Sequence, residues 1–486
     1  MHREAGMHCD LLIRNATIVD GTRAPRYCGD IAVRDGLIAA LGDIDDMRAE
    51  SEIDASGLIA APGFIDAHTQ DDRLLFSDPA MTPKASQGVT TVITGNCGIS
   101  LACSPVKAAQ TPPLDLLDNE GGWFRFPSFA AYCEELSARP AAINAACLVG
   151  HTTLRCATMD RLDRAATPAE ISRMRELARE ALACGAIGIS TGTAYAPAAA
   201  ASTDELIEVC RPLGEFGGIY VTHMRNEDAH ITAAIDETCA IGRALNVPVI
   251  ISHHKCAGVA NHGRSGATLA QIEQAMRSQN VGLDCYPYVA SSTVLRADRL
   301  AQSTRIIITW SKPHPEFSGI DLDEVARRLG VSEAEAVEKI KPAGAVYFML
   351  DESDVQRILA FDETMIGSDG LPHDAKPHPR LWGTFPRVLG HYCRELKLFS
   401  LETAVYKMTG LPAKKFGLTR RGVLQVGAHA DITLFDEASV IDVADFQNST
   451  KPAKGIETVI VSGVAVWAQG RATGARPGRV LLYKQR

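Results

Sequence analysis

Residues 218–255 have the sequence GIYVTHMRNEDAHITAAIDETCAIGRALNVPVIISHHK, in which two short apolar runs flank a longer amphipathic segment. The runs at 218–222 and 247–252 are rich in Val and Ile and have the length of buried strands. The residues between them, 227–245, have the apolar spacing of an amphipathic helix. A strand, a helix and a second strand predict a βαβ unit with two parallel strands.

The same alternation of strands and helices continues on both sides of this unit. Six further apolar runs bring the expected strands to eight, at residues 63–66, 89–94, 143–149, 186–190, 281–285 and 364–368. Amphipathic helices are expected between several of them, at 168–184, 203–216 and 268–279. Eight strands over roughly 350 residues predict a closed (β/α)8 TIM barrel, which is an α/β fold, within residues 62–414.

One segment of the barrel region is too long to be a single connection between strands. Residues 286–363 are therefore expected to form an inserted lid subdomain, with helices at 322–328 and 333–340. Long insertions of this kind often act as lids or substrate-binding loops. We expect this one to contribute to substrate specificity.

The two ends of the chain both have the pattern of β structure. Residues 1–61 and 415–486 contain short runs rich in Val and Ile, with Asp35-Gly36 and Ser462-Gly463 as expected hairpin turns. Because chain termini often lie close together, both ends are expected to pack into one small β-sandwich domain.

The composition argues against several classes of protein. The chain has 49 Lys and Arg against 58 Asp and Glu, a net charge of −9, which disfavours nucleic acid or a membrane surface as a partner. Its 13 cysteines are odd in number and scattered, unlike a disulfide framework. No apolar run reaches the ~18 residues of a membrane span, and the N-terminus lacks the apolar core of a signal peptide. We therefore expect a cytoplasmic protein with reduced thiols, either a monomer or a small homo-oligomer, that acts on a small molecule.

Five of the expected strands run directly into a side chain that can bind a metal or transfer a proton. These side chains are His68, Cys97, His223, His253 with its neighbour His254, and Asp369. The C-terminal ends of all strands in a parallel barrel open on one rim, where barrel active sites lie. A single His, Cys or Asp at a strand end is more often a core or turn residue, but five at equivalent positions favour a shared site.

The residue types favour zinc. Zinc binds Cys sulfur and His nitrogen, and a catalytic zinc keeps three protein ligands and one water molecule. Cys97, His223 and His253 would supply one thiolate and two imidazoles, and the pKa of the bound water would fall to about 7. Asp369 would take a proton from that water and pass it to the leaving group. This arrangement suits hydrolysis of an amide or ester.

The chain resembles the amidohydrolase superfamily and, within it, the N-acyl-D-amino-acid deacylases, also called D-aminoacylases. The motifs that carry this resemblance are APGFIDAHTQDD, GVTTVITGNCGIS, VGHTTLR, GAIGISTG, THMRNE, ISHHK, DCYPY, MIGSDGLPHD, PHPRLWGTFPRVLG and GVLQVGAHADITLFD. They cover nearly the whole chain. The resemblance implies a barrel with a β-sandwich, and zinc-dependent hydrolysis of N-acyl-D-amino acids to a D-amino acid and a carboxylate. It implies about one tightly bound Zn²⁺ per chain.

The resemblance also assigns roles to individual residues. It makes Cys97, His223 and His253 the zinc ligands and Asp369 the catalytic acid–base. It places the substrate α-carboxylate against Lys255, Tyr286, Ser292 and Arg380. The Arg380 guanidinium can form a bidentate fork with a carboxylate. The alternatives are a surface salt bridge for Arg380 and core packing for Tyr286.

The chain departs from the family pattern at one position. Family members carry His-x-His after the first barrel strand, whereas this chain has His68-Thr69-Gln70. Residues two apart on a strand point the same way, so Gln70 takes a ligand position, where a neutral amide is a weaker zinc ligand than an imidazole. A second metal at His68, Gln70 and Asp369 is therefore expected to bind weakly or not at all. The resemblance implies that this second metal is dispensable, so activity with one zinc is expected.

Two other functions stay open from the sequence. A hydantoinase or dihydropyrimidinase of the same superfamily would carry a carboxylated Lys near the fourth barrel strand, yet residues 143–151 and 186–193 contain no Lys. A non-catalytic binding protein with a defective metal site is favoured only by Gln70. Metal content would separate this scaffold from the enzymes.

The expected side-chain preference rests on Ala194, Tyr195 and Arg296. Ala194, beside Tyr195 in TGTAYAP, falls where relatives that prefer hydrophobic substrates carry a bulky aromatic residue. Arg296 begins the expected lid, and a smaller wall with a cation suits an acidic side chain, D-glutamate above all. In the alternatives, Arg296 faces solvent or pairs with Asp298, and the enzyme is a broad D-aminoacylase for hydrophobic side chains.

Overall fold

The computed structural model describes residues 8–103 and 112–483, and within them the eight expected barrel strands all form. Their order in the parallel sheet is β6 (Phe64–Asp66), β7 (Val89–Thr94), β8 (Asn144–Gly150), β9 (Gly188–Gly192), β10 (Ile219–His223), β11 (Val249–Ile251), β12 (Val281–Cys285) and β16 (Thr364–Ile366). Two backbone hydrogen bonds then join the last strand to the first, from Ala67 N–H to the Ile366 oxygen (3.2 Å) and from Asp369 N–H to the His68 oxygen (2.8 Å). The expected barrel is therefore confirmed, and it is nearly closed.

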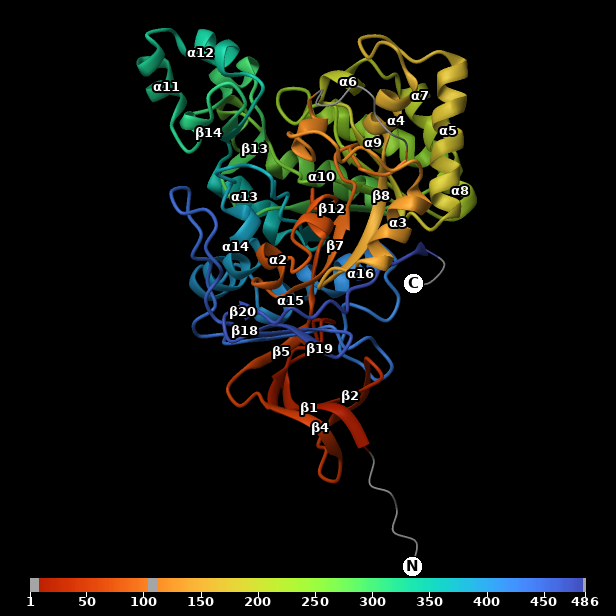
Figure 1. Ribbon diagram of the computed structural model, residues 1–486, viewed down its shortest axis with the longest axis vertical. Coiled ribbons are helices and arrows are strands. Elements are labelled where there is room, and N and C mark those ends of the chain that lie inside the picture. The colour runs from red at the N-terminus through yellow and green to blue at the C-terminus, as the bar shows by residue number, and fades with distance from the viewer. Residues whose placement is uncertain (1–7, 104–111, 484–486) are drawn as a thin grey trace, which may run out of the picture.

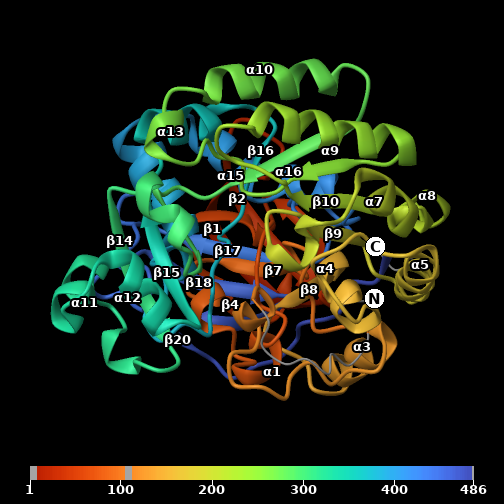
Figure 2. The same cartoon turned by 90° about the horizontal axis from the view of Figure 1, so that it is seen from above.

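Helices surround the barrel strands, as seen from above in Figure 2. The longer ones are α3 (Phe129–Ala138), α4 (His151–Thr158), α5 (Pro168–Ala183), α7 (Thr203–Cys210), α9 (Ile231–Leu245), α10 (Ser265–Met276), α13 (Glu352–Ala360), α14 (Arg380–Arg387) and α15 (Leu401–Met408). The shorter ones are α1 (Leu74–Ser77), α2 (Thr82–Ala85), α6 (Ala196–Ala199), α8 (Pro212–Phe216) and α16 (Gly410–Lys415). None of the helices in the described ranges is both long and apolar enough to cross a membrane.

Local sequence explains where these helices begin. α5 starts at a capping box, in which the Thr167 hydroxyl accepts a hydrogen bond from the Glu170 N–H and the Glu170 carboxylate accepts one from the Thr167 N–H. The single helix expected at 203–216 is instead two helices, because Pro212 cannot donate within a continuous helix. α9 begins at Ile231 and not at 227, which leaves Glu227 in the loop after β10.

Strands from both ends of the chain join in one nine-stranded sheet, which lies below the barrel in Figure 1. It contains β1 (His8–Ile18), β2 (Tyr27–Arg34), β3 (Leu37–Gly42), β4 (Arg48–Asp54), β5 (Ile59–Pro62), β17 (Ile432–Phe435), β18 (Ile456–Val461), β19 (Val464–Ala468) and β20 (Arg471–Ala472). Both expected turns occur with left-handed backbone, φ 54° and 73° at Asp35-Gly36 and 47° and 80° at Ser462-Gly463. The turns meet through Ala430, which donates to the Gly36 oxygen and accepts from the Gly463 N–H.

The insertion between β12 and β16 folds around its own core. Its antiparallel sheet has the order β13 (Ala290–Val294), β15 (Ala343–Phe348) and β14 (Arg305–Ser311). The two expected helices form as α11 (Leu322–Leu329) and α12 (Glu333–Ile340). Leu322, Val337 and Tyr347 belong to a hydrophobic cluster separate from the barrel core. Figure 1 shows this insertion at one side of the barrel rim.

A buried ion pair braces the barrel where it closes. The Lys84 ammonium donates to Asp66 Oδ2 (2.8 Å) and to the Ser368 hydroxyl (2.6 Å), and it lies 3.4 Å from Asp71 Oδ2. Asp66 also accepts a hydrogen bond from the Ser368 N–H (2.8 Å). The side chains of Lys84, Asp66 and Asp71 are fully buried, so their charges depend on one another.

The substitution Lys84→Met is expected to destabilise the protein strongly. It would leave the Asp66 and Asp71 carboxylates buried without a cation, which costs about 3–5 kcal/mol when one partner of a buried pair is removed. Urea denaturation followed by circular dichroism measures this loss of unfolding free energy. Lys451→Met, at an exposed lysine, is the matched control and should change stability by less than about 0.5 kcal/mol. Equal unfolding free energies of the two variants would contradict a stabilising role for the buried ion pair of Lys84.

Candidate metal centre

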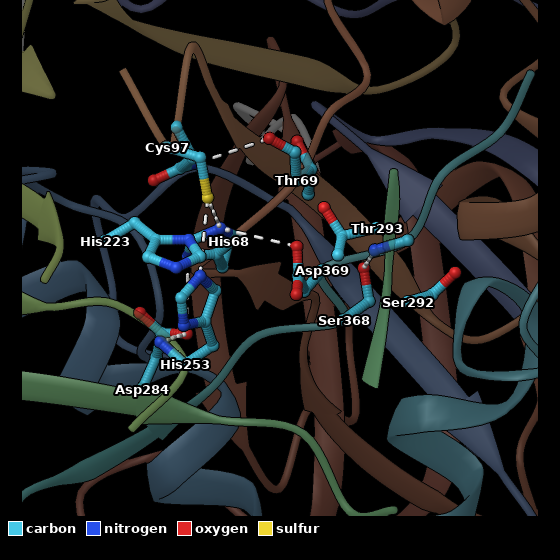
Figure 3. A network of polar contacts seen from close by, with 12 residues as sticks. His68, Thr69, Cys97, His223, His253, Asp284, Ser292, Thr293, Ser368 and Asp369 are labelled. Atoms are coloured by element: carbon cyan, nitrogen blue, oxygen red, sulfur yellow. Dashed lines mark hydrogen bonds and ion pairs between the residues drawn. The ribbon is translucent and has the colours of Figure 1, made fainter. Parts of the chain in front are cut away.

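Side chains from five strand ends meet at the C-terminal rim of the barrel (Figure 3). His68 follows β6, Cys97 follows β7, His223 ends β10, His253 follows β11 and Asp369 follows β16. Cys97 Sγ lies 3.2 Å from His68 Nε2 and 3.4 Å from His253 Nε2. Asp369 Oδ1 lies 3.6 Å from His68 Nε2. The barrel thus brings together side chains that are far apart in the sequence.

His253 lies at the centre of this group. Its ring centroid is 4.7 Å from that of His68 and 4.4 Å from that of His223. One nitrogen, sulfur or oxygen atom from each of His68, Cys97, His253 and Asp369 lies within 4.8 Å of the others, and the same holds for His223, Glu227 and His253. All of these side chains are buried. The two sets share His253, so they form one continuous site.

The backbone at this rim is held in an uncommon conformation. Cys97, His253 and Asp369 have positive φ angles of 54°, 34° and 48°. Such a conformation costs a residue other than glycine about 1–3 kcal/mol and persists only where the surroundings enforce it. Gly192 contributes by its lack of a side chain, because a Cβ there would lie 2.1 Å from the Cys97 carbonyl oxygen. The fold therefore fixes the directions of these three side chains.

The donor set fits a zinc-like metal ion. Burial alone would raise the pKa of the Cys97 thiol, but the neighbouring His68 and His253 hold that pKa well below its usual value. The thiolate is the form of cysteine that binds metals. Neither ring nitrogen of the buried His223 has a well-formed hydrogen bond within residues 8–103 and 112–483. One thiolate, several imidazoles and a carboxylate are typical ligands of zinc.

Two carboxylates that the sequence analysis did not single out orient the histidines. Asp284 Oδ1 accepts a hydrogen bond from the backbone N–H of His253 (2.9 Å) and lies 3.5 Å from the ring nitrogen Nδ1 of His68. Glu227 Oε1 lies 2.9 Å from His253 Nδ1, and Glu227 Oε2 lies 3.5 Å from His223 Nε2. The available signals were an aspartate inside the apolar run 281–285 and a glutamate four residues after His223.

Two of the four residues expected to hold a substrate carboxylate are free to do so. The Nε and Nη1 atoms of Arg380 and the hydroxyl of Tyr286 are buried and have no hydrogen-bond partner among the described residues. Arg380 lies over the Tyr286 ring, 4.5 Å from its centroid. Of the other two, Ser292 Oγ donates to the Ala345 oxygen (3.3 Å). Lys255 Nζ donates to Glu227 Oε1 (2.6 Å) and lies over the Tyr286 ring, 5.7 Å from its centroid.

Arg380 also controls the charge of Asp369. Its Nη2 lies 2.9 Å from Asp369 Oδ2. Burial opposes ionisation of the Asp369 carboxyl, but Arg380, His253 and His68 together lower its pKa to about 2. Asp369 is therefore a carboxylate at neutral pH and accepts hydrogen bonds.

Gln70 follows His68 by two residues and lies in the interior of the protein. Its side chain is almost fully buried, and its Oε1 atom has no hydrogen-bond partner among the described residues. Position 70 therefore offers a buried neutral amide, and the expected weakness of a second metal set with His68 and Asp369 stays a prediction.

A cavity of about 620 Å³ lies beside the metal centre and shares Tyr195 with it. The Tyr195 ring packs edge-on against His223, with centroids 4.9 Å apart, and its hydroxyl lies 3.1 Å from Thr293 Oγ1. Apolar atoms dominate the lining, which includes Ala194, Tyr195, Ala199, Val294, Leu295 and Ala343.

The basic groups of this cavity are already paired. Arg296 donates from Nε and Nη2 to Asp298 (3.0 and 2.6 Å) and from Nη1 to the Ala194 oxygen (3.2 Å). Lys341 donates to Glu338 (2.7 Å). The structure therefore has the Asp298 pairing that the sequence left open for Arg296.

Comparisons with known proteins point to one family. A match to the amidohydrolase family covers residues 51–254 and 257–467. A D-aminoacylase of Alcaligenes xylosoxydans xylosoxydans is 60% identical over 473 residues, which is 97% of each chain. An N-acyl-D-aspartate deacylase of the same organism is 52% identical over 481 residues, covering 98% of this chain and 96% of the relative.

Two solved structures are similar over nearly the whole chain. A D-aminoacylase with a binuclear metal centre, activated by one metal and attenuated by a second, has a TM-score of 0.96 and 58% identity, covering 98% of this chain and 100% of that one. An N-acyl-D-glutamate deacylase from Bordetella bronchiseptica, complexed with zinc and a phosphonate that mimics the tetrahedral intermediate, has a TM-score of 0.94, 46% identity and the same coverage. The chain therefore belongs to the N-acyl-D-amino-acid deacylase, or D-aminoacylase, family of the amidohydrolases.

Proposed function

We propose that this protein hydrolyses the amide bond of N-acyl-D-amino acids with one zinc ion held by Cys97, His223 and His253. The observation that carries this proposal is the convergence of the Cys97 sulfur and the buried imidazoles of His223 and His253 at the barrel rim, with Cys97 Sγ 3.4 Å from His253 Nε2 and the two rings 4.4 Å apart. A bound zinc ion supplies a polarised water as nucleophile and a Lewis acid for the amide carbonyl. The stereochemistry of the substrate comes from the relatives, which are deacylases of D-amino acids.

Arg380 and Tyr286 would hold the α-carboxylate of the substrate. Their buried N–H and O–H groups lack partners among the described residues, and such groups are costly unless a ligand satisfies them. A carboxylate accepts charge-assisted hydrogen bonds from guanidinium N–H groups, and Nη1 or Nε of Arg380 together with the Tyr286 hydroxyl offers such donors. This contact would fix the amide bond relative to Asp369, which lies 2.9 Å from the same guanidinium.

Asp369 would move the proton that hydrolysis requires. Its carboxylate is ionised, because the pKa is lowered to about 2, so it can accept a proton from the attacking water. It would then deliver that proton to the amide nitrogen as the C–N bond breaks, which releases the D-amino acid and the carboxylate. The nearby Arg380 keeps the carboxylate in place through both transfers.

We infer that the substrate side chain occupies the cavity beside Tyr195 and is preferably uncharged. The lining is mainly apolar, and Arg296 is neutralised by Asp298. Burial and the nearby Asp374 raise the pKa of Asp115, which also lines the cavity, to about 7. A broad preference for hydrophobic side chains therefore fits better than the acidic preference, which would need a free Arg296.

Substitutions at Cys97 and Asp369 separate metal binding from turnover. Cys97→Ala should lose both zinc and hydrolysis of N-acetyl-D-leucine, because it removes the thiolate ligand. Asp369→Asn should keep about one zinc per chain and lose at least about 100-fold in kcat, as expected for loss of a general acid–base. Plasma emission spectrometry and a ninhydrin assay measure the two quantities. Turnover retained in Asp369→Asn would refute the proton-transfer role, and metal-free wild-type protein would support a non-catalytic scaffold.

Gln70→His is expected to create a second metal site. The wild-type protein should bind about one zinc in equilibrium dialysis, because an amide replaces the second imidazole. The variant should bind about two, and excess zinc should then reduce its activity, as in the D-aminoacylase attenuated by a second metal. Gln70→Ala is the control and should keep one. Two tightly bound zinc ions in the wild-type protein would contradict this assignment.

Asp298→Ala tests the side-chain preference. It would release the Arg296 guanidinium, and a hydrogen bond to a charged group contributes about 1.5–3 kcal/mol. The kcat/KM for N-acetyl-D-glutamate relative to N-acetyl-D-leucine should therefore rise about tenfold. The double variant Asp298→Ala with Arg296→Leu should lose the gain. A wild-type enzyme that already prefers glutamate, and loses that preference in Arg296→Leu, would support the acidic alternative instead.

A further inference from the structure

Glu227 is a buried carboxylate that contacts two of the metal-site histidines at once. It lies in the loop between β10 and α9, and only 5% of its surface is exposed. Its Oε1 atom lies 2.9 Å from His253 Nδ1, and its Oε2 atom lies 3.5 Å from His223 Nε2. The loop itself is fixed from the neighbouring strand end, because the Glu227 carbonyl oxygen accepts a hydrogen bond from the Ala257 N–H (2.7 Å).

The same carboxylate holds the Lys255 ammonium. Lys255 Nζ donates to Glu227 Oε1 (2.6 Å) and to the His253 carbonyl oxygen (2.8 Å). It also lies over the Tyr286 ring, 5.7 Å from its centroid, on the ring that Arg380 approaches to 4.5 Å. Glu227 therefore stands between the metal-binding and carboxylate-binding sides of the site, and it compensates the charge of one of the two cations beside Tyr286.

Glu227 and Lys255 both contact the side of the His253 ring that faces away from Cys97. Glu227 Oε1 lies 2.9 Å from His253 Nδ1 and Lys255 Nζ lies 2.8 Å from the same nitrogen, whereas Nε2 faces Cys97 Sγ at 3.4 Å. Groups that hold one ring nitrogen of a histidine fix the ring and leave its other nitrogen directed at the metal. The carboxylate and the ammonium that it holds therefore set the orientation of this ring together.

We propose that Glu227 is a positioning residue for both halves of the site: it orients His253 for the metal and holds Lys255 toward the substrate carboxylate. This inference rests on the proposed deacylase function. Glu227 Oε1 contacts the Lys255 ammonium at 2.6 Å, and Glu227 Oε2 faces His223 Nε2 at 3.5 Å, so the carboxylate is engaged on both of its oxygens. Its effect on hydrolysis is therefore exerted through His253 and Lys255.

The test compares Glu227→Gln, Lys255→Met and the double variant. Glu227→Gln should weaken zinc binding by about 10–100-fold, the usual effect of losing a hydrogen-bond partner of a metal ligand. It should also raise the KM for N-acetyl-D-leucine. Lys255→Met should raise KM, and it should weaken zinc binding less than Glu227→Gln does, because the Glu227 carboxylate still contacts His253 and His223. If both KM effects pass through the same ammonium, the double variant should have the KM of Lys255→Met alone.

The cobalt-substituted proteins supply a readout that does not depend on activity. Glu227→Gln should alter the thiolate-to-cobalt charge-transfer band, because His253 is no longer held. Glu237→Gln is the matched control, since Glu237 is a carboxylate on α9 paired with Arg225, and it should leave the band and the zinc affinity unchanged. Glu227→Asp, whose carboxylate is retained on a shorter chain, should recover part of the zinc affinity.

The outcomes separate the two proposals. No thiolate-to-cobalt band in the wild-type protein would overturn the proposed metal site. A wild-type band with unchanged zinc affinity in Glu227→Gln, or KM effects that multiply in the double variant, would overturn the role of Glu227 alone. Loss of zinc affinity in Glu237→Gln as well would show a general loss of structure and would also count against the specific role.

Discussion

The closure of a parallel barrel is the constraint on which the rest of the structure depends. Two backbone hydrogen bonds, from Ala67 to Ile366 and from Asp369 to His68, join the last strand to the first. This closure brings His68 and Asp369, which follow the first and last strands, next to each other, with Asp369 Oδ1 3.6 Å from His68 Nε2. Because all strands run in the same direction, every strand end contributes to one rim. The order and direction of the strands therefore determine where the site lies, and the contacts between its side chains follow from that placement.

The site concentrates charge in a region from which water is largely excluded. Two of its buried carboxylates each lie beside a cation, Asp369 beside Arg380 and Glu227 beside Lys255. Buried charges persist only when they are paired in this way. The Nε and Nη1 atoms of Arg380 and the Tyr286 hydroxyl have no hydrogen-bond partner among the described residues, and in the proposed function they receive the substrate carboxylate.

Much of this architecture could be predicted from the sequence because it follows from short-range patterns. Runs rich in Val and Ile predict the barrel strands, and the residue at the end of each strand predicts the rim. Asp-Gly and Ser-Gly pairs predict turns because two adjacent left-handed φ angles favour such residues. The rim residues could be named from the sequence because each one follows a strand directly.

The contacts between side chains could not be predicted in the same way. Glu227 could not be singled out from the sequence because the apolar spacing places it in the helix after β10, whereas that helix begins four residues later and leaves Glu227 in the loop. Asp284 lies inside an apolar run, and its role could not be predicted from the sequence because it depends on contacts with His68 and His253, which only the fold brings beside it. Whether Arg296 faces a ligand or Asp298 depends on a choice of rotamer, which composition does not encode.

The insertion between β12 and β16 has a consequence for how such enzymes diversify. It contributes one wall of the cavity, yet its hydrophobic cluster is separate from that of the barrel. Changes within this module can reshape the space offered to a substrate while the hydrolytic rim keeps its own support. Substrate preference can thus change through substitutions in the insertion, while the residues at the barrel rim stay the same.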